Sequence, residues 1–472
     1  MKEYCIQKNM DRNITTALKT WHSSKVRKPL VLRGARQVGK STLVRLFADE
    51  HGLDLLEVNL ERHRDLDSMF AGLDVRTILA NLEAIAGRRV GPRTLVFLDE
   101  IQATPHALQA LRYFFEDRPD LALVAAGSLL EFALSRAGFS MPVGRVRYLH
   151  LQPMGFGEFL AAVDAASLEW LEMLRGTGTI PQEAHRRLLT RQREYLLVGG
   201  MPEAVACFAE TRDFAAVASV QNAILNTYLD DFSKYARQAD LADLQRLFRN
   251  LPLHLGQKAK YTRLLPDAAS AHSRKLLELL IRAQVALPVH GSDCTGIPLR
   301  AGMNPRVLKL FFLDVGLVSR LLGLDWAEME SLEERRLVNE GPLAEQFIAQ
   351  HLHQDSSFET PPELFYWLNE AKNANAEIDF VVSQGSLVLP VEVKAGKAGT
   401  LKSLHLFCAR RRLAQAVRFD LCPPSTQAIQ TRLTNKNGSD LEGRYTLHSL
   451  PLYAVETLPA LMKKIRAEGW RE

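Results

Sequence analysis

The chain has 472 residues, which suggests about two to four domains. Apolar residues make up 47% of the chain and charged residues 24%, an ordinary globular balance, and the net charge of +5 by itself indicates no partner. No stretch reaches the uninterrupted apolar length of about 18 residues that a membrane span needs, so the composition excludes a membrane-spanning protein.

The amino terminus and the cysteines indicate the compartment. Residues 1–13 are polar and lack the apolar core of a signal peptide. The cysteines are scattered and odd in number, and no two have metal-ligand spacing; they are Cys5, Cys207, Cys294, Cys408 and Cys422. We therefore expect a reduced, cytoplasmic protein with no membrane partner.

One segment carries the strongest functional signal. Residues 34–41 fit G-x-x-x-x-G-K-[ST], the phosphate-binding P-loop. Residues 29–32 before it read as a short buried strand, and residues 41–48 after it read as the start of an amphipathic helix. A chance glycine turn is the alternative, and the order of strand, loop and helix argues against it. The residues expected to contact the nucleotide are Gly34, Ala35, Arg36, Gln37, Val38, Gly39, Lys40, Ser41 and Thr42.

The residue types in this loop suit a triphosphate. Glycines let the backbone turn tightly, so that several N–H groups point at phosphate oxygens, and the following helix N-terminus adds partial positive charge. Lys40 is expected to reach the β- and γ-phosphates, and the Ser41 hydroxyl is expected to ligate Mg²⁺. ATP and Mg²⁺ are therefore the predicted cofactors.

A second motif lies about sixty residues further on. Residues 93–100 form an apolar run that ends in Asp-Glu, the Walker B pattern. Such a run predicts a strand buried on both faces, with its acids emerging at the carboxyl end where α/β sheets bind ligands. Asp99 is expected to hold Mg²⁺, directly or through water, and Glu100 is the candidate general base that polarises the attacking water.

Several further segments together resemble a known family. The stretches that carry the likeness are 34–40, 98–102, 144–145, 151–159, 199–204 and 228–235. Together they are similar to bacterial and archaeal AAA-type ATPases whose carboxyl-terminal portion is a domain of unknown function, and the likeness covers nearly the whole chain. Ser41 stands where relatives commonly have threonine, which has the same metal chemistry. The resemblance implies an α/β P-loop AAA-type domain that hydrolyses ATP.

The resemblance also implies two accessory residues at the phosphates. AAA-type ATPases place a small polar residue after a further strand, and Ser128 follows the apolar run 121–126. A helix N-cap is the alternative role for Ser128. Arg145, in the family's Gly-Arg pair, is the candidate arginine that neutralises the γ-phosphate from a neighbouring subunit or a lid. If a neighbouring subunit supplies it, the protein is a homo-oligomer. Arg147 lies close by, and a surface arginine is the alternative for Arg145.

The middle of the chain is predicted to be mostly helical. Residues 199–202 predict a sharp break between two helices. Residues 240–290 read as three short helices followed by a strand. That order resembles a winged helix-turn-helix, in which Ser273, Arg274 and Lys275 would begin the recognition helix. A packing module between domains is the alternative, and it is favoured because two basic residues are thin evidence for nucleic-acid contact.

The carboxyl-terminal region holds a second constellation. Residues 375–382 and 387–394 read as paired strands that carry Asp379, Glu392 and Lys394, the order found in the PD-(D/E)XK nuclease fold. Residues on strands alternate faces, so Glu392 and Lys394 share one face and Asp379 can meet them. The two acids would hold a metal ion, and Lys394 would orient water or stabilise the developing charge. A surface ion pair on an edge strand is the alternative.

Two more acids and a basic stretch complete this prediction. The helix predicted over 341–349 carries Glu345, which nucleases of this fold point at the metal, and Glu377 is a possible additional acid. Residues 393–419 contain seven basic residues and no acidic ones, suited to a nucleic-acid backbone, although a solvated helix face is equally typical. These basic residues are Lys394, Lys397, Lys402, Arg410, Arg411, Arg412 and Arg418.

The complete prediction is an α/β protein in three parts. Residues 1–165 form the AAA-type P-loop ATPase domain, residues 166–335 a helical and winged-helix-like middle, and residues 336–472 a nuclease-like α/β domain. The function expected is ATP hydrolysis coupled to engagement of nucleic acid, DNA rather than RNA. Three versions stay open, namely an ATP-driven nuclease, a nucleotide-switched binding protein that does not cleave, and a regulatory ATPase acting on a protein.

Overall fold

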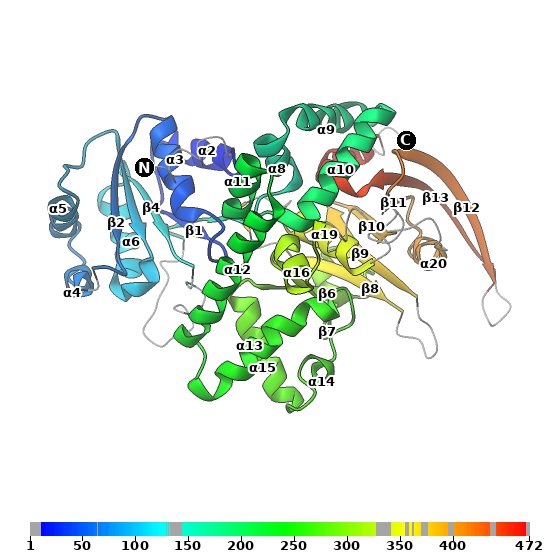
Figure 1. The fold of residues 1–472 in the computed structure, drawn as a ribbon. Helices are drawn as coiled ribbons and strands as arrows, with labels where there is room; N and C mark the ends of the chain where they lie inside the picture. Colours follow the sequence, from blue (N-terminus) through cyan, green and yellow to red (C-terminus); the bar gives the residue numbers. More distant parts are fainter. Residues whose placement is uncertain are drawn as a thin grey trace.

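The computed structural model describes residues 11–63, 65–128, 130, 132, 144–326, 341–354, 358–360, 363–369, 376–394, 401–434 and 440–468. Figure 1 shows an amino-terminal α/β region at the left, helices through the middle, and a second sheet at the right. Among the helices within these ranges, none is both long and apolar enough to cross a membrane.

The first sheet has five strands in the order β2-β3-β4-β1-β5, and all neighbours are parallel. Its strands are β1 (Leu30–Arg33), β2 (Asp54–Asn59), β3 (Thr94–Asp99), β4 (Ala122–Ala126) and β5 (Arg147–His150). Strands β3 and β4 are buried at every residue, as expected for apolar runs covered on both faces. The strands predicted before the P-loop and before the two acids are confirmed.

Helices connect and cover these strands. They are α2 (Thr15–His22), α3 (Lys40–Glu50), α4 (Leu66–Ala71), α5 (Val75–Ala86), the 3₁₀ turn η2 (Ile101–Ala103) and α6 (Pro105–Asp117). The start of α5 is fixed by its N-cap, because the Asp74 carboxylate accepts hydrogen bonds from the N–H groups of Arg76 and Thr77. The end of α5 has Gly87 in the left-handed conformation.

The middle of the chain is helical, as predicted. Its longer helices are α8 (Phe156–Val163), α9 (Ala165–Thr177), α10 (Gln182–Val198), α11 (Pro202–Thr211), α12 (Phe214–Asp231), α13 (Leu241–Asn250), α15 (Ser270–Arg282) and α16 (Val315–Leu321). Its shorter turns are η3 (Phe232–Lys234), η4 (Gln238–Asp240), η5 (Leu251–His254), α14 (Tyr261–Leu264) and η6 (Leu299–Gly302). In Figure 1 helices α9 and α10 lie at the top of the view, α11 and α12 lie between the two sheets, and α13, α14 and α15 lie below them.

The break between α10 and α11 requires two glycines. Gly199 has φ of +74°, and a Cβ atom there would lie 2.1 Å from Oδ1 of Asp314. A Cβ atom on Gly200 would lie 2.0 Å from the carbonyl oxygen of Met154. Because only glycine permits both approaches, this turn can contact the segment after β5 on one side and the residue before α16 on the other.

The second sheet has eight strands in the order β12-β13-β11-β10-β9-β8-β6-β7. Its strands are β6 (Ala286–Ser292), β7 (Met303–Phe312), β8 (Leu364–Leu368), β9 (Glu377–Gln384), β10 (Leu387–Val393), β11 (Gln415–Asp420), β12 (Ser425–Thr434) and β13 (Asp440–Pro451). The predicted hairpin of β9 and β10 is confirmed as an antiparallel pair, and β10 continues parallel to β11.

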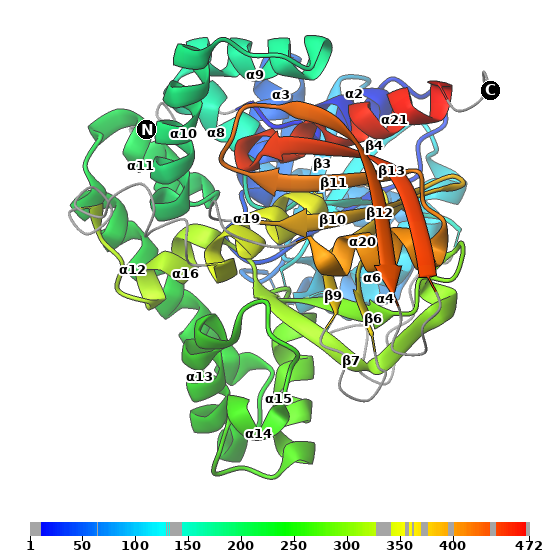
Figure 2. The same cartoon turned by 90° about the vertical axis from the view of Figure 1, so that its right-hand side faces the viewer.

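Helices pack against this sheet from the same region of the chain. They are α19 (Gly341–Gln354), α20 (Lys402–Arg411), α21 (Leu458–Glu468) and the 3₁₀ turn η7 (Leu452–Thr457). In Figure 2 helix α20 crosses the sheet on the face toward the viewer. Its Phe407 packs against Trp367 of β8, with the two rings tilted by 49°. Helix α19 confirms the helix predicted from residue 341, and its Phe347 is completely buried.

The second sheet joins two of the predicted parts. Strand β6, from the region expected to be a separate middle domain, pairs in parallel with β8 from the carboxyl-terminal region. Strands on both sides of the predicted boundary between residues 335 and 336 therefore belong to the same sheet. The reason is that strand pairing over a long sequence separation leaves no mark in the local pattern on which the boundary was based.

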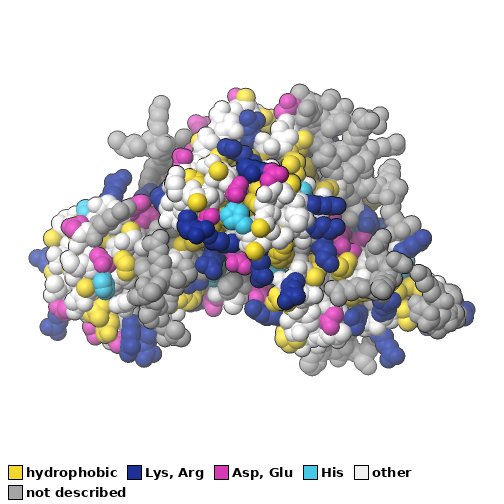
Figure 3. All heavy atoms as spheres, turned by 90° about the horizontal axis from the view of Figure 1, so that it is seen from below, with side chains coloured by type: hydrophobic (Ala, Val, Ile, Leu, Met, Phe, Trp, Pro, Cys, Tyr) yellow, Lys and Arg dark blue, Asp and Glu magenta, His cyan; other side chains and the backbone are white. Residues whose placement is uncertain are grey.

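The predicted order of three helices and a strand is confirmed by α13, α14, α15 and β6. The hairpin of β6 and β7, however, is built into the large sheet. At the start of α15, Ser273 is buried, Lys275 pairs with Asp240 at 2.7 Å, and Arg274 pairs with Glu278. Figure 3, a view onto this module, shows basic side chains interspersed with acidic ones, which favours the packing alternative.

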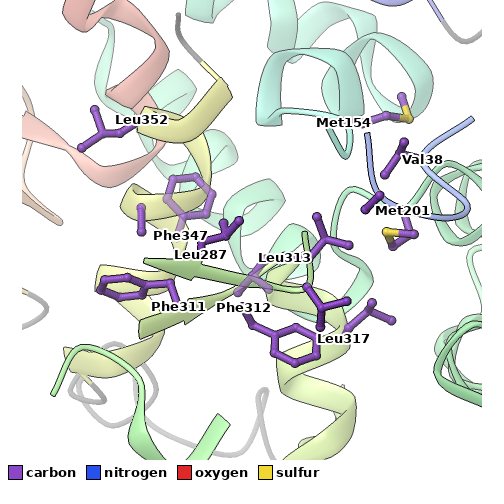
Figure 4. Packing of buried hydrophobic residues seen from close by; sticks show 14 of the residues in the cluster. Val38, Met154, Met201, Leu287, Phe311, Phe312, Leu313, Leu317, Phe347 and Leu352 are labelled. Atoms are coloured by element: carbon purple, nitrogen blue, oxygen red, sulfur yellow. The ribbon is translucent and has the colours of Figure 1, made fainter. Parts of the chain in front are cut away.

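A shared apolar core runs from the P-loop to the second sheet. Figure 4 shows Val38 beside Met154 and Met201 on one side, and Phe347 of α19 above the strand residues Phe311 and Phe312 on the other. All of these side chains belong to one cluster of buried residues. The amino-terminal region, the helical middle and the second sheet are therefore packed together.

His351 makes stability depend on pH. Its ring is buried, with Nε2 accepting a hydrogen bond from the Phe156 N–H at 2.9 Å and Nδ1 lying 2.7 Å from the Phe347 carbonyl oxygen. Burial lowers the pKa of His351 to about 4. The unfolded chain takes up a proton near the usual histidine pKa and the folded chain does not, so the stabilisation is complete above that value and declines as the pH falls toward 4.

We expect this histidine to contribute about 2 kcal/mol to the loss of unfolding free energy between pH 6.5 and pH 5. His351→Gln keeps an acceptor but cannot take up a proton, so its loss over the same interval should be smaller by about that amount. Urea unfolding of both proteins at pH 6.5 and pH 5 measures the difference. Equal losses in the two proteins would contradict the prediction.

Candidate functional site

The P-loop begins helix α3 with a left-handed glycine. Gly39 has φ of +92°, and a Cβ atom there would lie 3.4 Å from Pro202 of α11. Lys40 follows as the first helical residue and is buried, with Nζ donating to the carbonyl oxygens of Gly34 at 3.0 Å and Ala35 at 2.7 Å. Burial lowers the pKa of Lys40 to about 8, against the opposing pull of Glu100 and Asp99.

The two nucleotide motifs meet at Ser41 and Asp99. Their side chains are 58 residues apart in sequence, and the Ser41 hydroxyl donates to Oδ2 of Asp99 at 2.9 Å. Burial raises the pKa of Asp99, and the hydrogen bond from Ser41 opposes that rise. A hydroxyl and a carboxylate brought together in this way are hard oxygen ligands that fit Mg²⁺.

The other predicted residues of the phosphate end lie beside this pair. Glu100 follows β3 in the left-handed region with φ of +53°, and its Oε2 accepts a hydrogen bond from Gln102 at 2.5 Å. Ser128 follows β4, and its buried hydroxyl has no hydrogen-bond partner within the described part of the chain. That hydroxyl is therefore available to a ligand. The N-cap alternative for Ser128 depends on residues that lie outside the described ranges.

A cavity of about 620 Å³ opens over these groups. Its phosphate end is lined by Arg36, Gln37, Gly39, Lys40, Ser41, Thr42, Asp99, Glu100 and Ser128. The opposite wall comes from helices α11 and α12 and includes Pro202, Glu203, Ala206, Cys207, Glu210 and Val220. Gly34, Ala35 and Val38 do not line it, and the side chains of Ala35 and Val38 are buried beneath the loop. The volume suits a nucleotide.

Helix α12 also contacts the P-loop directly. The Tyr228 hydroxyl donates to the Arg36 carbonyl oxygen at 2.7 Å, and the Arg36 guanidinium pairs with Asp231 at 2.6 Å. From the amino-terminal side, Arg12 donates to the Val38 carbonyl oxygen at 3.1 Å. The sequence prediction did not include these contacts, although Tyr228 and Asp231 lie in a stretch that resembles the AAA-type family.

Comparison with known proteins agrees with this geometry. Residues 26–160 match the family described as AAA domain. The chain carries an AAA-type P-loop ATPase domain. Two domains of unknown function match further on, DUF8612 over residues 189–328 and DUF4143 over residues 340–432. No curated protein matches the chain. Together with the site, the AAA match supports an ATP-binding and ATP-hydrolysing protein of the AAA type.

Two solved structures similar to the chain are both RuvB from Thermotoga maritima. One is a variant, with a TM-score of 0.26 and 20% identity, covering 60% of this chain and 89% of that one. The other is the RuvB Holliday junction branch migration motor, with a TM-score of 0.25, 19% identity and the same 60% and 89% coverage. Likeness at this level adds nothing to the assignment of residues.

Arg145 does not line the cavity of its own ATPase domain. It is half exposed and pairs with Glu116 of α6, with Nε 3.1 Å from Oε1. Arg147 forms an ion pair with Glu359. In this structure Arg145 therefore lies away from the phosphate end of the cavity, and its role from a neighbouring subunit or a lid stays a prediction.

A second cluster of charged residues lies in the DUF4143 region and beside it. The structure brings together the predicted residues Glu345 of α19, Asp379 of β9, and Glu392 and Lys394 of β10, although Lys394 lies just past the strand end. The Asp379 Oδ2 accepts a hydrogen bond from the Val393 N–H at 2.8 Å. Lys394 Nζ lies 2.5 Å from Oε1 of Glu392. The hairpin thus brings Asp379 to the end of β10 that carries Glu392 and Lys394.

The sequence prediction missed the residue at the centre of this cluster. Lys309 of β7 is 1% exposed, and its Nζ lies 3.5 Å from Glu345 and 3.7 Å from Asp379. It also forms an ion pair with Glu377. Burial opposes the charge on Lys309, but the three carboxylates outweigh burial and raise its pKa. No motif marks Lys309, because its strand joins this sheet only in the folded protein.

The predicted metal ligands are not arranged as a metal site. Burial raises the pKa of Glu345 and of Glu392, and the charge of Asp379 adds to both effects. Among the residues that the structure describes, no group of three or more His, Cys, Asp or Glu side chains is arranged to hold a metal ion. Lys309 instead pairs with Glu345 and Asp379. The expected ligand set of Glu345, Asp379 and Glu392 therefore does not fit a metal ion as arranged.

Proposed function

We propose that this protein uses ATP binding and hydrolysis to control how its carboxyl-terminal α/β domain engages nucleic acid. The observation that carries the ATPase part is the 2.9 Å contact between Ser41 and Asp99 at the phosphate end of the cavity. Ser41 and Asp99 would hold Mg²⁺, Lys40 would bind the phosphates, and Glu100 would accept a proton from the attacking water. The ion would neutralise charge on the phosphate oxygens.

Buried polar contacts support the coupling between the two ends of the molecule. The Tyr195 hydroxyl of α10 donates to the Met154 carbonyl oxygen, and Met154 lines the nucleotide cavity. Gln350 of α19 donates to the Tyr195 hydroxyl at 2.9 Å and to Asp314 at 3.2 Å. Asp314 in turn accepts a hydrogen bond from the Gly200 N–H. A movement of α11 on nucleotide binding would therefore reach the helix that carries Glu345.

The basic end of helix α20 supports engagement of nucleic acid. Arg410 and Arg411 lie in its last turn and Arg412 is its C-cap residue. The helix dipole also favours cations at this end. Arginines clustered in this way suit a phosphodiester backbone, and we favour DNA over RNA. Lys397, also in the predicted basic stretch, lies outside the described residues. Arg418 is not free for this role, because it pairs with Asp420 at 2.9 Å.

The experiment measures binding and cleavage of labelled single- and double-stranded DNA and RNA. Replacing Arg410, Arg411 and Arg412 together with alanine should weaken binding at least about tenfold and flatten its salt dependence. Arg89→Ala, an exposed arginine of the ATPase region, is the matched control and should bind normally. Wild-type binding should differ between ATP and ADP, and Lys40→Ala should lose that difference.

The same assay separates the three versions of the function. Cleavage that needs Mg²⁺ or Mn²⁺ and is lost in Asp379→Ala would identify an ATP-driven nuclease. Salt-sensitive binding without cleavage would identify a nucleotide-switched binding protein. Undetectable binding, with ATP turnover indifferent to every nucleic acid, would contradict the proposal and favour a protein substrate.

A further inference from the structure

Lys309 holds together carboxylates that come from separate elements. Glu345 lies on α19, Glu377 and Asp379 lie on β9, and the Lys309 ammonium is within ion-pair distance of all three. Side by side without a cation, these carboxylates would repel one another. The Lys309 ammonium also lies 5.2 Å from the centre of the Tyr366 ring, whose face attracts cations. This side chain is thus enclosed by groups that favour its positive charge.

The ammonium competes with a metal ion for the same oxygens. A divalent cation at Glu345 and Asp379 would need their carboxylates at ligand distance. Those carboxylates already neutralise a buried lysine, and leaving that lysine unpaired would be strongly destabilising. Lys309 cannot withdraw to solvent easily, because it is 1% exposed and lies on the buried part of β7. The metal would therefore have to displace a charge that has nowhere else to go.

We propose that Lys309 is the resident cation of this cluster and takes the place expected for a divalent ion, so that the carboxyl-terminal domain keeps its acidic residues together without metal. The inference rests on the proposed function in assigning this cluster to the domain that engages nucleic acid. It favours the version in which that domain grips nucleic acid without cutting it. At the neighbouring position, the Lys394 ammonium likewise neutralises the Glu392 carboxylate.

One observation favours the opposite outcome and so defines the test. Oε2 of Glu392 is buried and has no hydrogen-bond partner among the described residues. With Asp379 nearby, that oxygen could contribute to a metal site on the side away from Lys309. If the wild-type cluster takes up a divalent ion there, Lys309 has not replaced the metal.

The experiment titrates Mn²⁺ into nucleotide-free protein and follows it by calorimetry and by the electron paramagnetic resonance of free Mn²⁺. Every protein carries Asp99→Asn, so that the P-loop contributes no ion. We expect no binding by the protein with Lys309 and binding of about one equivalent after Lys309→Met, because its carboxylates then lack a cation. Lys309→Arg keeps the charge and should bind none. Lys402→Met, an exposed lysine of α20, is the matched control and should also bind none.

A poorly folding Lys309→Met variant would still decide the matter. Its thermal midpoint should then rise toward the wild-type value when Mn²⁺ is added, since the ion replaces the missing charge, whereas the Lys402→Met midpoint should not move. Lys309→Met that neither binds nor is stabilised by Mn²⁺ would overturn the inference. Mn²⁺ binding to the protein that keeps Lys309, abolished by Glu392→Gln, would overturn it as well.

Nucleic-acid binding in EDTA separates this inference from the proposed function. If nucleic acid binds but the cluster with Lys309 takes up Mn²⁺, the role of Lys309 fails and the proposed function stands. If the Mn²⁺ titrations come out as expected but no nucleic acid binds, the proposed function fails and the role of Lys309 stands. Salt-dependent binding in EDTA, with no Mn²⁺ uptake, supports both.

Discussion

Lys40→Ala should abolish ATP turnover, lowering kcat by at least about 10²- to 10³-fold, the range for removing one preorganised group at a developing charge. Lys40 is the first residue of α3, and its ammonium lies inside the loop that the phosphates would enter. A methyl group in its place leaves the loop without its fixed positive charge. The measurement is steady-state phosphate release with saturating ATP and Mg²⁺.

Two controls make the result for Lys40→Ala specific. Lys25→Ala removes an exposed lysine of the same region and should turn over ATP at the wild-type rate. The circular dichroism and thermal midpoint of Lys40→Ala, compared with those of wild type, show whether the variant is folded. Full turnover by a folded Lys40→Ala protein would refute the assignment of the nucleotide site.

Glu100→Gln should separate ATP binding from hydrolysis. The expected result is ATP affinity within about threefold of wild type and kcat lower by about 10²- to 10⁴-fold, the usual contribution of a general base. The reason is that an amide keeps the size and the contact with Gln102 but cannot accept a proton. Binding is measured by the fluorescence of a labelled ATP analogue, and turnover by phosphate release.

The control for Glu100→Gln is the same change at an exposed glutamate. Glu169→Gln on α9 alters one surface charge and should leave both affinity and turnover unchanged. If Glu100→Gln hydrolyses ATP at the wild-type rate, another group activates the water, and Glu100 has only a structural role at the end of β3. If it loses affinity as strongly as turnover, Glu100 acts chiefly in binding.

The nucleotide motifs could be predicted because their chemistry lies in short runs of consecutive residues. The P-loop supplies its own turn, ammonium and hydroxyl within residues 34–41, and the apolar run before Asp99 predicts a buried strand. Parallel strands present their carboxyl ends at the same edge of a sheet, so the meeting of Ser41 and Asp99 followed from two local patterns.

The wall of the nucleotide cavity could not be predicted in the same way. Helices α11 and α12 reach the P-loop from more than 160 residues away, and Tyr228 contacts Arg36 over a separation of 192 positions. Arg145 was placed at the phosphates by resemblance, yet within its own chain it pairs with Glu116. Contacts of this kind depend on how helices pack, which a local pattern does not encode.

The amino-acid sequence alone therefore determined the class of the fold, the P-loop with its acidic partner strand, and the strand pair that carries Asp379 and Glu392, because each is written in residues close together along the chain. Only the tertiary structure decided that β6 and β7 join the carboxyl-terminal sheet and that Lys309 lies among the acids. The physical reason is that a buried charge is tolerated only where distant partners neutralise it, and those partners are assembled by strand pairing and core packing.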